Sequence, residues 1–235
     1  MLKELEKELD SLKDSERSAA LQRFFKTGKG QYGEGDIFIG LTVPQSRLYA
    51  KKYAGMAFAD ISKLLTSPVH EKRLIALLIL VHNFEKGSDT EKKQIFDFYM
   101  SSLQCVNNWD LVDLSAGKIV GSYVFNNDRS ILYKLALSKN LWKKRVAIIA
   151  TSYFISKGEY ADTLKIAEIL LNDSHDLIHK AVGWMLREVG KKDEGVLKKF
   201  LNKHAATMPR TMLRYAIEKF PEPERLKYLH TKHSI

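Results

Sequence analysis

A tryptophan and an aspartate stand four residues apart in the segment Asn108-Trp109-Asp110-Leu111-Val112-Asp113. Asn108 is typical of a helix N-cap, because its side-chain oxygen can accept a free N–H of the first turn. Asp110 suits the positive end of the helix dipole. Trp109 and Asp113 should then share one helix face. Such a pair is either ordinary surface or an aromatic platform beside an anionic catalytic group, and the spacing leaves both interpretations open.

A second tryptophan stands in the same relation to a charged residue. Trp184 follows Lys180 by four residues, and Trp142 precedes Arg145 by three. A single tryptophan is usually buried, and we expect Trp142 to pack between helices. Because Trp109 and Trp184 each lie one turn from a polar residue, the recurrence favours a functional role for these two.

Three other motifs carry weaker signals. His175 and His179 have a zinc-like spacing, but the metalloprotease glutamate and a third ligand are absent, so we predict no metal site. The glycine-rich segment 28–35 lacks a preceding strand and a Gly-Lys-Ser/Thr ending, which favours a mobile loop over a phosphate cradle. Cys105 has no evident partner base for a nucleophilic role. No cofactor is predicted.

Composition narrows the class of protein. The 235 residues carry a formal net charge of +10, which favours a polyanion such as nucleic acid, although a surface that is simply basic remains an alternative. No apolar run approaches the roughly 20 residues needed to span a bilayer. The beginning of the chain lacks a signal-peptide pattern, and one cysteine excludes an internal disulfide. We therefore expect a cytoplasmic protein without a membrane partner.

The chemistry-bearing residues belong to a repeating pattern of helices. The predicted pairs are 89–103 with 108–125, 128–138 with 141–157, 159–171 with 174–189, and 193–205 with 209–220. A polar residue stands early in each second helix, at intervals of 32 to 40 residues: Arg73, Asp113, Arg145, Lys180 and Arg214. This period predicts an all-α superhelical solenoid of HEAT-like two-helix repeats with a basic concave face.

The repeats are expected to form a single domain over residues 1–235, less regular in helices 1–65 and regular over 67–230. Earlier helices are predicted over 2–12, from Ser15 to Gly28, from Pro44 to Gly55, and over 57–65, with an extended segment at 37–43. Ser67 and Pro68 are expected to cap and open a helix that runs to Lys86.

Asp113 is the exception among the five polar positions, because the other four are cations. A carboxylate in a basic groove repels an anionic ligand, so its presence there indicates a specific function or a neutralising partner. Asp113 either has such a function or simply pairs with Arg145 or Arg73, and the spacing favours neither interpretation.

At these residues the chain resembles the DNA alkylation repair family, the AlkD-like HEAT-repeat DNA glycosylases. The resemblance covers most of the chain and is most specific in the pair of segments Trp109-Asp110-x-x-Asp113 and Gly183-Trp184-x-Leu186-Arg187-Glu188. Further matches are Gly40 to Pro44 followed by Arg47, His70 to Arg73, Trp142 to Arg145, and Pro209-Arg210. The glycine-rich segment looks longer than the corresponding turn of the family.

The resemblance implies a monomeric bacterial-type glycosylase that excises N3- and N7-alkylated, cationic purines from duplex DNA. It implies Asp113 as the catalytic aspartate and Trp109 and Trp184 as active-site tryptophans. It also implies Arg145 as a groove arginine. Together with the repeat pattern, it makes the candidate DNA contacts Arg145, Lys180, Arg47, Arg73, Arg214 and Arg210. Two alternatives stay open: a non-catalytic binder of branched or distorted DNA, and a HEAT scaffold for protein partners.

Overall fold

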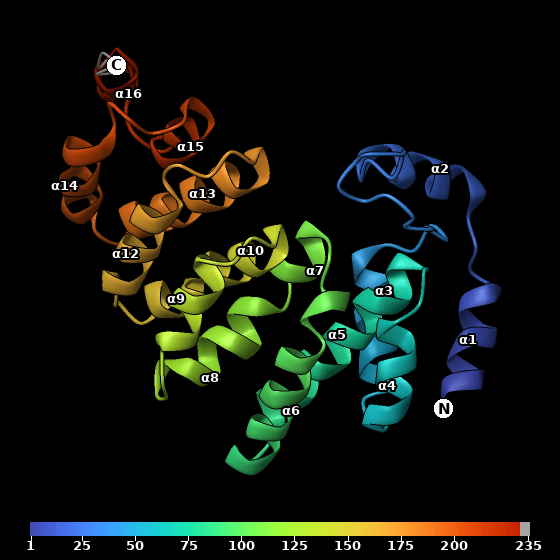
Figure 1. Ribbon diagram of the computed structural model, residues 1–235. Helices are drawn as coiled ribbons and strands as arrows, with labels where there is room; N and C mark the ends of the chain where they lie inside the picture. The colour runs from blue at the N-terminus through green and yellow to red at the C-terminus, as the bar shows by residue number, and fades with distance from the viewer. Residues whose placement is uncertain (231–235) are drawn as a thin grey trace. The chain divides into compact units, whose positions relative to one another are not determined.

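The computed structural model describes residues 1–230 and shows an all-α protein, as the sequence predicts (Figure 1). The chain forms two compact units, which meet in sequence between Ser115 and Ala116. That boundary does not coincide with the change near residue 67 from irregular helices to repeats. Within residues 1–230, β pairing is limited to one isolated bridge between Ile37 and Val69, and no helix is long and apolar enough to cross a membrane.

Seven α-helices make up the first unit. They are α1 (Leu2–Asp10), α2 (Ser15–Phe24), α3 (Val43–Lys52), α4 (Phe58–Leu65), α5 (His70–Lys86), α6 (Asp89–Ser101) and α7 (Trp109–Asp113), with a 3-10 turn at Leu103–Cys105. Helix α5 is the core of this unit: α3, α4, α6 and α7 all pack against it, and the residues of its apolar run from Leu74 to Val81 are buried. A helix that is apolar on every side is stable only when neighbours cover it in this way.

The start of α5 corrects one prediction. The helix begins at His70, and Ser67 and Pro68 are not its cap and first residue. Instead the segment before the helix pairs with the extended chain at Ile37, whose N–H donates to the Pro68 carbonyl at 3.0 Å while the His70 N–H donates to the Ile37 carbonyl at 2.8 Å. These two bonds place His70 at the edge of the unit's core, beside the end of the glycine-rich loop.

The second unit contains a π-helical turn at Gly117–Gly121 and nine described α-helices up to residue 230. They are α8 (Ser122–Phe125), α9 (Ser130–Ala136), α10 (Leu141–Ala150), α11 (Ser152–Ser156), α12 (Ala161–Leu170), α13 (Asp176–Lys192), α14 (Glu194–His204), α15 (Arg210–Ala216) and α16 (Glu222–Leu229). Helix α10 packs on α9 and α13, and α13 packs on α12, α14 and α15. The second helices of successive pairs therefore contact one another, as a two-helix repeat requires.

One predicted repeat helix is broken. The sequence predicts a continuous helix over 108–125, and the structure has α7, then the π-helical turn, then α8. A side chain at Gly121 would place its Cβ 2.0 Å from the Ala150 carbonyl oxygen, and one at Gly117 would meet the Ser152 hydroxyl at 2.3 Å. The chain thus departs from α-helical geometry where glycines let it approach α10 and α11 closely, and α7 remains a separate five-residue helix.

Candidate functional site

Helix α7 is built as the sequence predicts. Asn108 is its N-cap, with Oδ1 accepting the Trp109 N–H at 2.8 Å. The following Asp110 side chain also accepts a backbone bond, from Leu111 N at 2.8 Å. Trp109 and Asp113 are partly exposed, whereas the residues between them are buried. The helix therefore presents the indole and the carboxylate to its accessible side.

Aromatic side chains from the first unit hold the Trp109 indole. Phe25 stacks on it at a centroid distance of 4.9 Å and an interplanar angle of 7°, and Phe24 meets it edge-on at 5.8 Å. The indole Nε1 donates to the Tyr32 hydroxyl at 3.3 Å. Sequence analysis missed these three residues. The signal for them was an aromatic pair at the end of α2 and one aromatic residue inside the glycine-rich loop.

Tyr99 and Ser115 lie beneath the carboxylate end of α7. Both are buried, their hydroxyls are 2.8 Å apart, and Ser115 Oγ donates to the Leu111 carbonyl at 2.5 Å. Burial, together with the negative charge of nearby Asp113, raises the pKa of Tyr99 far above its usual range. Tyr99 therefore stays neutral and supports the helix without adding charge to the site.

A buried network of charged residues lies on the other side of α7. His70 Nδ1 is 3.0 Å from Asp36 Oδ2, and His70 Nε2 is 2.8 Å from Asp110 Oδ2. Asn108 Nδ2 also donates to Asp36, at 3.1 Å. The network thus joins the end of the glycine-rich loop, the first residue of α5 and the N-terminus of α7.

Arg73 belongs to this network, which corrects its prediction as a groove residue. Its side chain is 5% exposed, with Nη2 2.6 Å from Asp36 Oδ1. Nη1 donates to the Ser67 carbonyl at 2.9 Å. A guanidinium buried and paired in this way balances an internal acid and is not available to a DNA phosphate. The repeat pattern could not distinguish a buried cation from an exposed one at the same helical position.

The extended chain between the glycine-rich loop and α3 is fixed by Glu71. Its carboxylate accepts the backbone N–H groups of Ile39, Gly40 and Leu41 at 2.9–3.2 Å. Gly40 has φ 93°, and a Cβ there would lie 2.5 Å from the Asp14 carbonyl oxygen. This position therefore requires glycine, which explains one residue of the segment that precedes α3.

The glycine-rich loop closes on itself. The Gly28 N–H donates to Gln31 Oε1 at 3.0 Å, and the Gly30 N–H donates to Glu34 Oε2 at 2.8 Å. Loop N–H groups that a phosphate cradle would offer to a ligand are thus bound by the loop's own side chains. The loop instead delivers Tyr32 to Trp109 and Asp36 to the buried network.

In the second unit, Arg145 is buried on α10 at 5% exposure. Its Nη1 donates to the Leu177 carbonyl at 2.5 Å, which places the guanidinium at the beginning of α13. Asn140 caps α10 by accepting the N–H groups of Trp142 and Lys143 at 2.9 and 3.1 Å. The role of Arg145 as a phosphate contact stays a prediction.

Lys180 and Trp184 lie one turn apart on α13, as predicted. Lys180 Nζ is 2.8 Å from Asp176 Oδ2, and the Trp184 indole donates to Glu188 Oε1 at 3.1 Å. Trp184 is partly exposed. The glycine before it lets α13 approach α15, because a Cβ at Gly183 would be 2.5 Å from the Met212 carbonyl oxygen.

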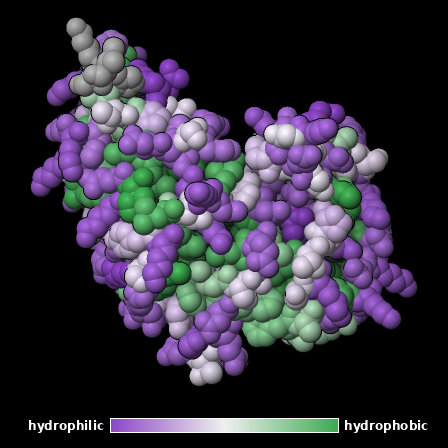
Figure 2. Space-filling model, viewed as in Figure 1, coloured by the Kyte–Doolittle hydropathy of each residue, from purple (hydrophilic) through white to green (hydrophobic). Residues whose placement is uncertain are grey.

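Three predicted DNA contacts are accessible cations. Arg47 on α3 and Arg214 on α15 are exposed, and Arg210 is partly exposed. Among residues 1–230, none of the three forms an ion pair. Figure 2 shows hydrophilic residues over much of the visible surface.

The histidine pair has a structural explanation. His175 is the N-cap of α13, its Nδ1 accepting the Leu177 N–H at 3.1 Å, and burial lowers its pKa. His179 Nε2 lies 2.5 Å from the Asp173 carbonyl oxygen. In the described part of the chain, no group of three or more His, Cys, Asp or Glu residues could hold a metal ion.

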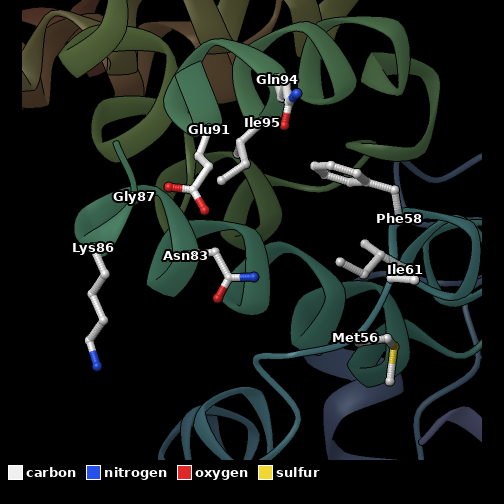
Figure 3. Close-up of a pocket in the computed structure, with 10 residues that line it drawn as sticks. Met56, Phe58, Ile61, Asn83, Lys86, Gly87, Glu91, Gln94 and Ile95 are labelled. Atoms are coloured by element: carbon white, nitrogen blue, oxygen red, sulfur yellow. The ribbon is translucent and has the colours of Figure 1, made fainter. Parts of the chain in front are cut away.

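A cleft of about 400 Å³ lies away from all of these residues, between α4, α5 and α6 (Figure 3). Phe58, Ile61 and Ile95 form much of its wall. Two of its polar groups serve local structure: Asn83 donates to the Ala54 carbonyl at 2.8 Å, and Glu91 closes the capping box of α6. Its size therefore does not identify it as the functional site.

The fold agrees with comparisons to known proteins. Residues 5–220 match the family model of the DNA alkylation repair enzyme, and the chain therefore belongs to the DNA alkylation repair family. No curated protein sequence matches the chain.

Solved structures share the fold at low sequence identity. The predicted DNA alkylation repair enzyme from Enterococcus faecalis is 17% identical, with a TM-score of 0.67, 89% of this chain covered and 97% of that one. AlkD2 from Streptococcus mutans is also 17% identical, with a TM-score of 0.56 and coverage of 87% and 97%. The protein smu.31 from Streptococcus mutans UA159 has a TM-score of 0.55 at 17% identity, with coverage of 87% and 98%.

Proposed function

We propose that this protein is a DNA glycosylase that hydrolyses the N-glycosidic bond of cationic alkylated purines, such as 3-methyladenine and 7-methylguanine, in duplex DNA. The observation that carries the proposal is the construction of α7. Its indole is held by Phe25 and Tyr32, and the partly exposed carboxylate of Asp113 lies on the same helix face. Membership in the DNA alkylation repair family supports the same conclusion.

The chemistry follows from the charge of the substrate. Alkylation at N3 or N7 makes the purine a good leaving group that needs no general acid. The sugar gains oxocarbenium character in the transition state, and a carboxylate near C1′ stabilises that charge and orients the attacking water. Two unit charges about 4 Å apart interact by roughly 4 kcal/mol at an effective dielectric near 20. That energy corresponds to about three decades in rate.

Each remaining residue has a role in this proposal. The faces of Trp109 and Trp184 contact the deoxyribose, where electron-rich rings favour the developing cation. Arg145 is 5% exposed and donates to the Leu177 carbonyl, so its proposed contact with a phosphate next to the lesion rests on the family resemblance. Lys180 contributes positive charge. The exposed Arg47, Arg210 and Arg214 contact the DNA backbone. The protein acts as a cytoplasmic monomer without metal or cofactor.

The family resemblance implies that the base is excised without being flipped out of the duplex. Enzymes that act on a base usually extrude it into a pocket. Here the alkylated base is proposed to stay in or near the DNA base stack while the protein binds the DNA backbone. Bulky cationic adducts should then be released, and uncharged lesions should be poor substrates.

The test is release of 7-methylguanine from a duplex oligonucleotide by the wild type and by Asp113→Asn under single-turnover conditions. We expect a rate about a thousandfold lower for the variant, with duplex affinity retained. Equal rates for the two proteins would contradict the proposal. A wild type that binds duplex without releasing base would support the alternative, a binder of branched or distorted DNA.

A further inference from the structure

Helix α7 is too short to fix its own position. It spans five residues, Trp109–Asp113, and isolated helices shorter than about 12 residues are marginal in water. Its polar residues Asn108 and Asp110 are buried, so the groups that bind them determine where Trp109 and Asp113 point. Those groups converge on His70.

The ring of His70 is enclosed from every side. Phe38 stacks on it at a centroid distance of 4.5 Å, and Phe25 lies at 5.1 Å. Its two nitrogens face two different carboxylates, Asp36 at 3.0 Å and Asp110 at 2.8 Å. Only the imidazolium form has an N–H on both nitrogens, so only that form donates to both acids.

The charges around the ring require this proton. Asp36 faces His70 from the glycine-rich loop, Asp110 faces it from α7, and Arg73 faces it from α5 with Nη2 3.4 Å from Nδ1. The Glu71 carboxylate, also on α5, is bound by backbone N–H groups of residues 39–41. With His70 protonated, two acids balance two cations. Burial lowers the pKa of His70, but the hydrogen bonds that the ring donates to Asp110 and Asp36 outweigh it and raise the pKa above its ordinary value.

Losing the proton would weaken the link to the loop first. Asp110 also accepts the N–H of Leu111, whereas Arg73 lies near the Nδ1 side of the ring. A neutral ring is therefore best placed with Nε2–H on Asp110 and a lone pair on Nδ1. Asp36 then loses a hydrogen-bond donor. Asp36 also accepts a hydrogen bond from Asn108 Nδ2, and Oδ1 of the same Asn108 side chain accepts the Trp109 N–H at the start of α7.

We propose that His70 is a positioning residue for the α7 site: its doubly protonated ring, held between Asp36 and Asp110, fixes the helix that carries Trp109 and Asp113. Phe25 provides a second connection, because it contacts both the His70 ring and the Trp109 indole. Base release should therefore fall on the alkaline side as the ring loses its proton. This activity consequence rests on the proposed glycosylase function, whereas the positioning itself does not.

The activity test uses a duplex with one 7-methylguanine, a no-enzyme control at each pH, and single-turnover rates from pH 6 to 9. The wild type should lose rate as the pH rises. His70→Gln, which cannot donate to both acids, should release base about 10- to 100-fold more slowly at neutral pH. Its duplex affinity, measured by fluorescence anisotropy, should stay within about threefold, and its alkaline decline should disappear. His82→Gln, the same change further along α5, should behave as wild type.

A second readout is independent of catalysis and of any substitution. Nitrogen-15 NMR of the wild type should show both ring nitrogens of His70 protonated at neutral pH. The indole cross-peak of Trp109 should shift along the same titration. A singly protonated His70 at the pH of maximal rate would overturn the proposal, as would wild-type rates and pH profile in His70→Gln. A wild type without base release, but with the coupled NMR titration, would overturn the glycosylase function and leave the positioning role standing.

Discussion

Helices α7 and α13 each carry a tryptophan one turn from a charged residue, but they are stabilised in opposite ways. Helix α7 has five residues and depends on buried charges from Asp36, His70 and Arg73. Helix α13 has 17 residues, and its ion pair Asp176–Lys180 lies within the helix and is largely exposed. The same sequence spacing thus has different physical support in the two units.

This difference determines whether the position of each helix should depend on residues that are distant in the sequence. Surface ion pairs contribute about 0–1 kcal/mol because water screens them. A buried charge that loses its partner costs about 3–5 kcal/mol. The geometry of α7 should therefore respond to residues far away in sequence, whereas α13 should respond mainly to changes in its own packing.

The largest expected effect is a difference in stability between substitutions at Arg73 and Arg214, which occupy equivalent positions in the predicted repeats. Arg73→Met leaves Asp36 buried without its guanidinium partner, and we expect the free energy of unfolding to fall by about 3–5 kcal/mol. Arg214→Met, at the exposed position on α15, should change it by less than about 0.5 kcal/mol. Chemical denaturation of both variants measures the difference. Equal losses would show that burial does not distinguish the two sites.

A packing change should affect α13 next most strongly. Gly183→Ala would bring a Cβ within 2.5 Å of both the Met212 carbonyl oxygen and Tyr215 Cβ, and α13 and α15 would have to separate. We expect a loss of about 1–3 kcal/mol, as for other overpacked sites. Gly195→Ala is the matched control on α14, where a Cβ would meet only the Asp193 side chain, at 3.3 Å. Thermal unfolding of both proteins tests this, and similar melting temperatures would contradict the close contact.

The buried network also predicts opposite pH effects on stability. The pKa of His70 is raised above 6.5 in the folded protein, so its stabilising contribution is fully present below about pH 6.5 and is lost as the pH rises through the raised value. Burial raises the pKa of Asp36, but the His70 hydrogen bond and Arg73 outweigh it and lower the pKa below 3.8. That contribution is lost as the pH falls through the lowered value. Urea unfolding across pH 2–9 should show both declines, and His70→Gln should remove the alkaline one.

The helical fold and the face shared by Trp109 and Asp113 could be predicted because both depend on local periodicity. Residues four apart on a helix are neighbours wherever that helix packs. The cap at Asn108 was predictable for the same reason. The break in helix 108–125 was not, because it depends on how closely Gly117 and Gly121 approach other helices.

The network around His70 could not be predicted, because its members are far apart in the sequence. Asp36 and Asp110 are ordinary surface residues by type, and only the fold places them on opposite nitrogens of one ring. Arg73 was predicted as a groove cation for the same reason: helical position gives a direction, but burial depends on the segment that covers it. The Trp109 support from Phe25 and Tyr32 likewise required the course of the loop.

The smallest expected effect concerns the salt dependence of DNA binding. Each accessible cation that meets a phosphate should contribute about 0.9 to the slope of log affinity against log salt. Arg47→Gln, Arg210→Gln and Arg214→Gln should therefore each weaken duplex binding modestly, by a similar amount on every sequence, and lower that slope by about one. Arg73→Gln should leave the slope unchanged in the folded fraction, because its guanidinium is bound to Asp36 and Ser67. Anisotropy titrations at several salt concentrations measure the slopes. Two results would contradict this assignment of DNA contacts. One is a lower slope for Arg73→Gln, and the other is an unchanged slope for the variants at Arg47, Arg210 and Arg214.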